Sequence, residues 1–60
     1  MKLKDWRVRK ELSQEDLAKS LGTTQESVSY WESNEIMPRK EMLQAITELT
    51  NGKVTANDFI

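Results

Sequence analysis

The fold is decided by residues 13–32, which read SQEDLAKSLGTTQESVSYWE. Ser13 is followed three residues later by Asp16, a capping-box pattern that predicts the start of a helix. Gly22 stands after a run of apolar residues at helical spacing, at the position where helices commonly end in left-handed backbone. These signals predict a helix over Gln14–Leu21 that ends in a tight turn. Its inward stripe is Leu17, Ala18 and Leu21.

A second helix is predicted immediately after the glycine. Thr23 and Thr24 can each cap it, and Thr23 also has Glu26 three residues on, which is a second capping-box pattern. The helix would extend from about residue 24 to Glu32, with its inward face formed by Val28 and Trp31. Helix, short turn and second helix form the unit that places one helix in the major groove of DNA.

The flanking segments are also predicted to be helical, because their apolar residues recur every three or four positions and no stretch alternates. We expect helices over about Lys2–Lys10 and about Arg39–Thr50, and a short last turn capped by Thr55. Turns are expected at Ser33-Asn34 and Asn51-Gly52. The predicted core residues of these segments are Leu3, Trp6, Met42, Leu43, Ile46, Leu49 and Phe59. The sequence therefore predicts one all-α domain over residues 1–60.

Composition limits what a chain of 60 residues can do. It contains no cysteine and no histidine, which excludes disulfides and thiolate metal sites and removes the commonest general base and metal ligand. We therefore expect no metal, no cofactor and no enzymatic activity. No apolar run approaches the roughly 20 residues that span a membrane, so we expect no membrane partner and a cytoplasmic setting.

The charge is unevenly distributed along the chain. The net charge is −1, which by itself argues mildly against a nucleic-acid partner, because such domains are usually basic. Residues 1–11, however, carry five basic against two acidic side chains, and residues 12–36 carry one basic against five acidic. The average therefore conceals a basic N-terminal segment and an acidic centre.

Three runs carry a resemblance to a known family: LSQEDLA at residues 12–18, LGTTQ at 21–25 and VSYWE at 28–32. With these elements at these spacings, the chain resembles the phage repressor and Cro-type helix-turn-helix family, also called the XRE family, from about Leu3 to Phe59. The resemblance implies a five-helix, lambda-repressor-like bundle. Its second and third helices would be the DNA-binding pair.

The resemblance also implies roles for individual residues. Gln14 matches a family glutamine that touches a phosphate, and residues 24–30 match the recognition helix. Arg7 and Glu32 match a partly buried ion pair that links the first helix to the end of the third. The chain departs from the family pattern at several positions: Glu11 and Asn34 replace frequent glycines, Glu35 and Ile36 replace frequent basic residues, and Glu26 is acidic.

The residue types indicate how each position would meet DNA. The amide of Gln25 can pair with N6 and N7 of adenine, and Glu26 can either accept from N4 of cytosine or complete the helix cap. The predicted base contacts are Thr24, Gln25, Glu26, Ser29 and Tyr30. The predicted phosphate contacts are Gln14, Lys10, Arg39 and Lys40. Trp6 and Trp31 are interpreted as core residues, since single-strand binding needs exposed aromatic side chains on a basic groove.

The sequence thus favours a sequence-specific transcriptional regulator that binds double-stranded DNA at a pseudo-palindromic operator. One domain reads half a site, so a weak homodimer, or a dimer formed on DNA, is expected. Candidate dimer surfaces are Thr50–Lys53 and the segment near Ile60. The alternative is an antitoxin with a toxin partner, or an interaction module of the same fold without DNA binding. An exposed apolar patch at Ile36-Met37 or Val54-Ile60 would favour a protein partner.

Overall fold

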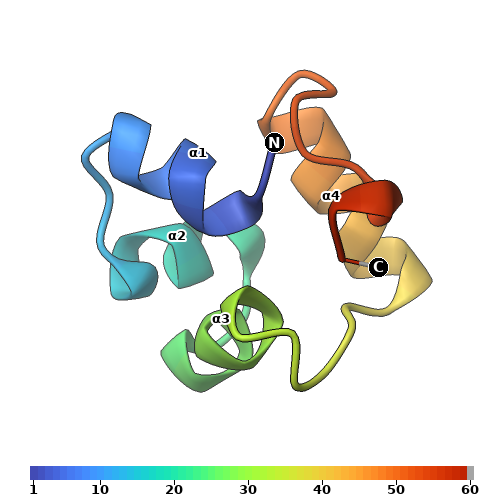
Figure 1. Cartoon of the computed structure of the whole chain (residues 1–60). Coiled ribbons are helices and arrows are strands. Elements are labelled where there is room, and N and C mark those ends of the chain that lie inside the picture. Colours follow the sequence, from blue (N-terminus) through green and yellow to red (C-terminus); the bar gives the residue numbers. More distant parts are fainter. Residues whose placement is uncertain (60) are drawn as a thin grey trace.

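The computed structural model describes residues 1–59 and contains four α-helices and one short 3-10 helix (Figure 1). The elements are α1 (Leu3–Arg9), α2 (Gln14–Leu21), α3 (Gln25–Glu32), α4 (Lys40–Leu49) and η1 (Ala56–Phe59). No strand occurs within the described residues, so the all-α prediction is confirmed. In the same part of the chain, no helix combines the length and the apolar content needed to cross a bilayer.

The expected count of five helices is wrong, because the structure has four α-helices. The last predicted element forms only the 3-10 turn η1, which has four residues. So short a segment makes too few backbone hydrogen bonds to offset the cost of nucleating an α-helix, and 3-10 geometry is common in such pieces.

The predicted capping box and glycine turn of α2 are both confirmed. Ser13 Oγ accepts from the amide of Asp16 at 3.0 Å, and the Asp16 carboxylate accepts from the amide of Ser13 at 3.3 Å. Gly22 ends the helix with φ 71° and ψ 33°, in the left-handed region. The next amide, of Thr23, donates back to the carbonyl of Ala18 at 2.9 Å. This closure reverses the chain and packs α3 against α2.

The cap of α3 is Thr24 rather than Thr23. Thr24 Oγ1 accepts from the amide of Ser27 at 3.2 Å. The predicted capping box between Thr23 and Glu26 is therefore wrong. The reason is that the Thr23 amide closes the end of α2, which leaves Thr23 in the turn and makes Thr24 the last residue before the new helix.

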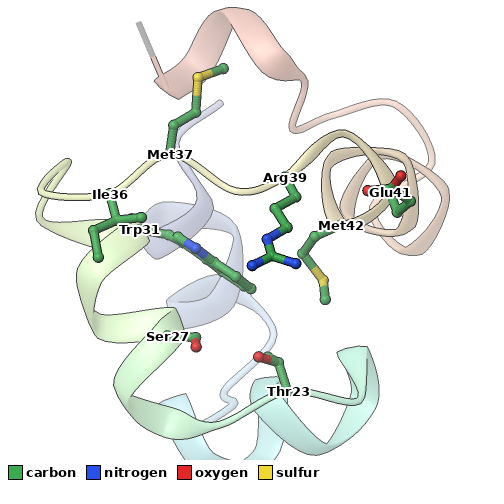
Figure 2. Close-up of a pocket in the computed structure, with 8 residues that line it drawn as sticks. All are labelled: Thr23, Ser27, Trp31, Ile36, Met37, Arg39, Glu41 and Met42. Atoms are coloured by element: carbon green, nitrogen blue, oxygen red, sulfur yellow. The ribbon is translucent and has the colours of Figure 1, made fainter.

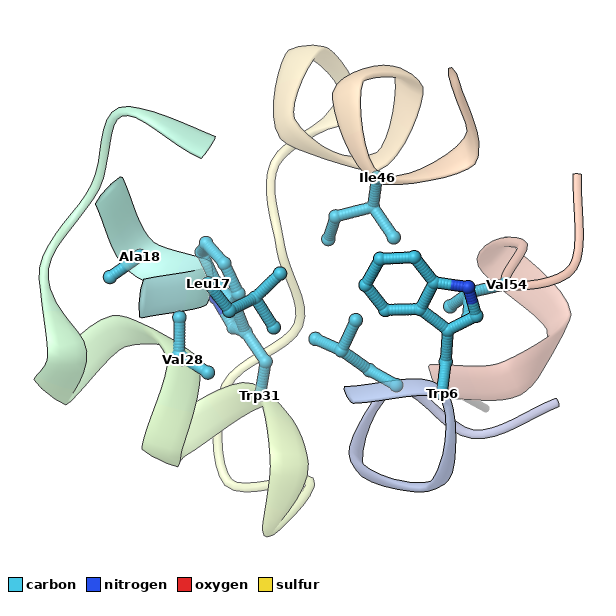
Figure 3. Close-up of a cluster of buried hydrophobic side chains, with 8 residues drawn as sticks. Trp6, Leu17, Ala18, Val28, Trp31, Ile46 and Val54 are labelled. Carbon is cyan, nitrogen blue, oxygen red and sulfur yellow. The ribbon is translucent and has the colours of Figure 1, made fainter. Parts of the chain in front are cut away.

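The core is formed by one cluster that takes residues from every α-helix (Figure 3). Its buried members are Leu3, Trp6, Leu17, Ala18, Val28, Trp31, Ile46 and Val54. Figure 3 shows the ring of Trp6 facing Ile46 and Val54. Both tryptophans are buried, as predicted. Val54 is fully buried, so it cannot contribute to an exposed apolar patch at Val54-Ile60, and Ile60 lies outside the described residues.

The end of α4 differs from the predicted core. Leu49 is 37% exposed, and the next residue, Thr50, is 2% exposed. The Thr50 hydroxyl donates to the carbonyl of Ile46 at 2.8 Å and accepts from the amide of Val54 at 3.1 Å. Because these bonds satisfy the hydroxyl, threonine can occupy the inward position where the chain turns back and Val54 enters the core. Thr50 is consequently unavailable as part of a dimer surface.

Among residues 1–59, three residues other than glycine have left-handed backbone: Glu11 at φ 57°, Asn34 at φ 61° and Asn51 at φ 55°. Asparagine tolerates this region better than most residues. Glutamate lacks that tolerance, so the tight connection from α1 to α2 is strained at Glu11. Glu11 and Asn34, which stand where the family often has glycine, therefore still adopt left-handed backbone.

Replacing Glu11 by glycine should stabilise the protein. Glycine adopts φ 57° without the steric cost that a side chain incurs there, and part of the gain is offset by its greater freedom in the unfolded chain. We expect a net gain of about 0.5–1 kcal/mol and a rise in Tm of about 2–8 °C, measured by thermal unfolding. Lys10→Gly is the control: Lys10 has φ −87°, so the same substitution should lower Tm. A lower Tm for Glu11→Gly would show that the site is unstrained.

The two ends of the described chain are joined through Asp58. The N-terminal amino group lies 3.1 Å from Asp58 Oδ1 and donates to the carbonyl of Lys53 at 2.9 Å. The amide of Thr55 donates to Asp58 Oδ2 at 2.9 Å, and Lys2 Nζ donates to the carbonyl of Asp58 at 2.8 Å. The bond from Thr55, and next the bond from the amino group, hold the pKa of Asp58 below its ordinary value.

The stability contributed by Asp58 should be present at neutral pH and lost in acid. Its folded pKa lies below the unfolded value of about 3.9, so the unfolded chain binds the proton first and acid favours unfolding. Urea midpoints measured from about pH 6 to about pH 2.5 should fall more for the unsubstituted protein than for Asp58→Asn, which has no carboxylate to protonate. Equal decreases in both proteins would argue against this role.

Candidate nucleic-acid interface

The outward face of α3 is a continuous exposed surface. Its exposed side chains are Gln25, Glu26, Ser29 and Tyr30, and the capping residue Thr24 is exposed beside them. The opposite face carries Val28 and Trp31, which are buried. An exposed α-helix of this kind fits the major groove of DNA, which is about 12 Å wide. The five residues predicted to contact bases therefore share one accessible surface.

The N-terminal turn of α3 carries a negative charge on this surface. Glu26 lies in the first turn, and the cap is made by Thr24 instead, so the Glu26 carboxylate is not used to close the helix. α3 has no basic residue in its last turn. The positive charge needed near a polyanion must therefore come from neighbouring elements.

Arg7 and Glu32 form a bidentate pair between α1 and the end of α3. Arg7 Nε donates to Glu32 Oε2 at 2.7 Å, and Nη2 donates to Oε1 at 3.1 Å. The two side chains are 12% and 5% exposed. Arg7 Nη1 also donates to the carbonyl of Leu12 at 2.9 Å, which holds the connection between α1 and α2. Hydrogen bonding to Glu32 raises the pKa of Arg7, so the guanidinium remains charged.

Gln14 joins this pair, a contact that sequence reasoning missed. Gln14 is the first residue of α2, and its Nε2 donates to Glu32 Oε1 at 3.0 Å. Its side chain is half-buried. The two residues are 18 positions apart, and no local pattern links them. The Glu32 carboxylate thus receives three hydrogen bonds from two other helices or their ends.

The predicted basic contacts lie on two different elements. Lys10 follows α1, and its Nζ lies 5.9 Å from the centroid of the Trp6 ring, within the range of a cation–π interaction. Arg39 occupies the N-cap position of α4 and Lys40 is its first residue, and both are exposed. No side chain caps α4, so its first-turn amides remain available as donors.

A groove of about 460 Å³ lies between α3, the loop that follows it and the start of α4 (Figure 2). Its lining residues are Thr23, Ser27, Trp31, Ile36, Met37, Arg39, Glu41 and Met42. Figure 2 shows the Arg39 side chain extending toward Trp31 and Met42. Ile36 is 53% exposed and Met37 is 49% exposed. Exposure of these two residues is the condition that would favour a protein partner, but the sequence did not indicate a groove.

A comparison with protein families gives one match. A family model described as helix-turn-helix matches residues 3–56, from the first residue of α1 to the first residue of η1. Comparisons with curated proteins and with solved structures give no significant match. The matched segment contains the α2–α3 unit, the residues of the ion pair and the uncapped start of α4.

Proposed function

Because the chain belongs to the XRE-type helix-turn-helix family of DNA-binding domains, we propose that it is a Cro- or repressor-like transcriptional regulator that reads a pseudo-palindromic operator through α3. The observation that carries this proposal is the exposed surface over residues 24–30, on a helix whose other face is anchored in the core. Such a helix can enter a major groove without disturbing the fold.

Base recognition is assigned to the exposed side chains of α3. Gln25 stands at the accessible start of the helix and can pair with N6 and N7 of adenine through both ends of its amide. Glu26 is not part of the cap, so its carboxylate can accept from N4 of cytosine. Thr24, Ser29 and Tyr30 would make the remaining contacts along the groove.

Phosphate binding is assigned to residues that flank α3. Arg39 and Lys40 would bind phosphate together with the uncapped amides at the start of α4, because helix N-termini favour anions. Gln14 at the start of α2 and Lys10 after α1 would contact the backbone on the other side. Few charged contacts are involved, so we expect modest affinity and a shallow dependence on salt.

Operator selection tests the proposed function. The protein is immobilised and duplexes are selected from a random library at low salt. Because one domain reads half a site, the enriched sequences should be pseudo-palindromes whose half-sites are about 34 Å apart. The exposed residues Asn51–Lys53 would lie at the contact between two copies. If no duplex is enriched, the regulator proposal fails.

The two types of contact should respond differently to substitution. Gln25→Ala should remove about 1–3 kcal/mol of discrimination at one operator position. Arg39→Ala should weaken binding to all sequences similarly and reduce the salt slope by about 0.9, because one phosphate contact is lost. Titrations of duplexes that carry each base at each position measure both effects. Uniform weakening by both variants would contradict the assigned division between base and phosphate contacts.

One observation favours a second function, that of an antitoxin or interaction module of the same fold. Ile36 and Met37 are exposed apolar residues beside the groove, and Ile36 stands where this family often has a basic residue. Exposed apolar patches commonly mark protein partners. If selection enriches no duplex, and Ile36→Asp abolishes binding of a protein partner that the unsubstituted chain binds, the second function is supported.

A further inference from the structure

The carboxylate of Glu32 is shared by two residues that lie on opposite sides of the α1–α2 connection. Oε2 accepts from Arg7 Nε, and Oε1 accepts from both Arg7 Nη2 at 3.1 Å and Gln14 Nε2 at 3.0 Å. Glu32 is the last residue of α3, and Gln14 is the first residue of α2. The carboxylate therefore links the end of the proposed recognition helix to the start of α2.

The bond to Glu32 restricts the direction of the Gln14 amide. A glutamine amide has two N–H donors and one carbonyl acceptor in a single plane. When one N–H points at Glu32 Oε1, the direction of the second N–H is set by the planar geometry. Gln14 is half-buried, so its side chain is held by the bond to Glu32 and still has exposed surface.

Arg7 makes this arrangement compatible with a polyanion. A lone carboxylate close to phosphates would repel them, whereas the charge of Glu32 is balanced by a bidentate guanidinium. Arg7 is itself held by the carbonyl of Leu12. The group of three side chains is thus close to neutral and has little freedom to rearrange.

We propose that Glu32 is a positioning residue for DNA binding, which aims the second amide hydrogen of Gln14 at a phosphate of the operator. Glu32 does not contact DNA in this arrangement and acts only through Gln14. The bond also fixes the phosphate-binding side chain of α2 relative to the end of α3. The contacts to the DNA backbone and the contacts to the bases are therefore held in a fixed relative position. This inference rests on the proposed function.

A double-mutant cycle tests the inference on the selected duplex. Gln14→Ala should weaken binding about tenfold, which is the value of a hydrogen bond to a charged group. Glu32→Gln should weaken it by a similar factor, because the amide that replaces the carboxylate holds Gln14 less firmly. The double variant should bind no more weakly than either single variant. The salt slope should be the same for Gln14→Ala as for the unsubstituted protein, because Gln14 carries no charge.

Controls separate positioning from loss of structure. Gln44→Ala removes an exposed glutamine on α4 and should leave affinity unchanged. Circular dichroism at the binding temperature gives the folded fraction by which each Kd is corrected. The free unsubstituted protein gives an independent measurement: the two side-chain amide protons of Gln14 should exchange slowly and be well separated by NMR, unlike those of Gln44.

The outcomes are distinguishable. If the unsubstituted protein selects no duplex, the proposed function fails and the inference fails with it. If the unsubstituted protein binds a selected duplex but the double variant loses about a hundredfold in affinity, the effects of the two substitutions are independent. In that case only the inference is overturned. The inference would also be overturned if Gln14→Ala bound the selected duplex with unchanged affinity. It would be overturned likewise if the side-chain amide protons of Gln14 exchanged as fast as those of Gln44.

Discussion

Replacement of Glu32 by alanine should lower the free energy of unfolding by about 3–5 kcal/mol. The substitution leaves the guanidinium of Arg7, whose side chain is 12% exposed, without its partner. It also removes the acceptor of Gln14 Nε2, so two partly desolvated donor groups lose their hydrogen bonds. A core in a domain of this size rarely supplies more than about 3–5 kcal/mol, so Glu32→Ala should be largely unfolded at 37 °C.

Urea denaturation followed by circular dichroism measures this effect. Glu35→Ala is the matched control, because it removes an exposed carboxylate from the loop that follows α3. Exposed substitutions usually change stability by less than about 0.5 kcal/mol. If Glu32→Ala costs no more than Glu35→Ala, the pair is not a structural link between α1 and α3.

Replacement of Trp31 by alanine should cost about 3–5 kcal/mol. Trp31 is buried on the inward face of α3, in the cluster that contains Val28 and Leu17. Removal of the indole would leave a cavity under the proposed recognition helix, and the surrounding helices can close it only in part. Loss of stability should therefore be accompanied by loss of DNA binding.

The neighbouring residue provides the control for this prediction. Tyr30 lies on the exposed face of the same helix. Tyr30→Ala should leave the urea midpoint nearly unchanged and weaken binding to the selected duplex, whereas Trp31→Ala should lower the midpoint strongly. The reverse pattern would show that α3 presents its other face to the outside, and the regulator proposal would then have no physical basis.

The helices could be predicted from the sequence because their signals are local. Capping hydrogen bonds join residues three positions apart, as in Ser13 and Asp16, and apolar stripes repeat within one or two turns. The left-handed backbone at Gly22 was equally predictable, because glycine is the residue that adopts it at little cost. The resemblance to the XRE family suggested the pairing of Arg7 with Glu32, which local patterns do not indicate.

Local signals were insufficient wherever two of them competed. Thr23 and Thr24 can both cap α3, and the outcome depended on the closure of the preceding helix, which uses the Thr23 amide. At the end of α4, periodicity favoured Leu49 as a core residue. Thr50 lies inside instead, because Val54 returns to the core there and the threonine hydroxyl is fully hydrogen-bonded.

The sequence by itself therefore determined the all-α class, the positions of the helices to within a residue or so, and the turn that joins α2 to α3. Only the tertiary structure decided that Glu32 accepts hydrogen bonds from both Arg7 and Gln14, and that a groove lies beside Ile36. It also decided that Thr50 rather than Leu49 is buried at the end of α4. The physical reason is the distance along the chain over which each kind of interaction acts. Caps and periodicity act over about four residues along the chain, whereas these contacts form between segments that meet only after the helices have packed.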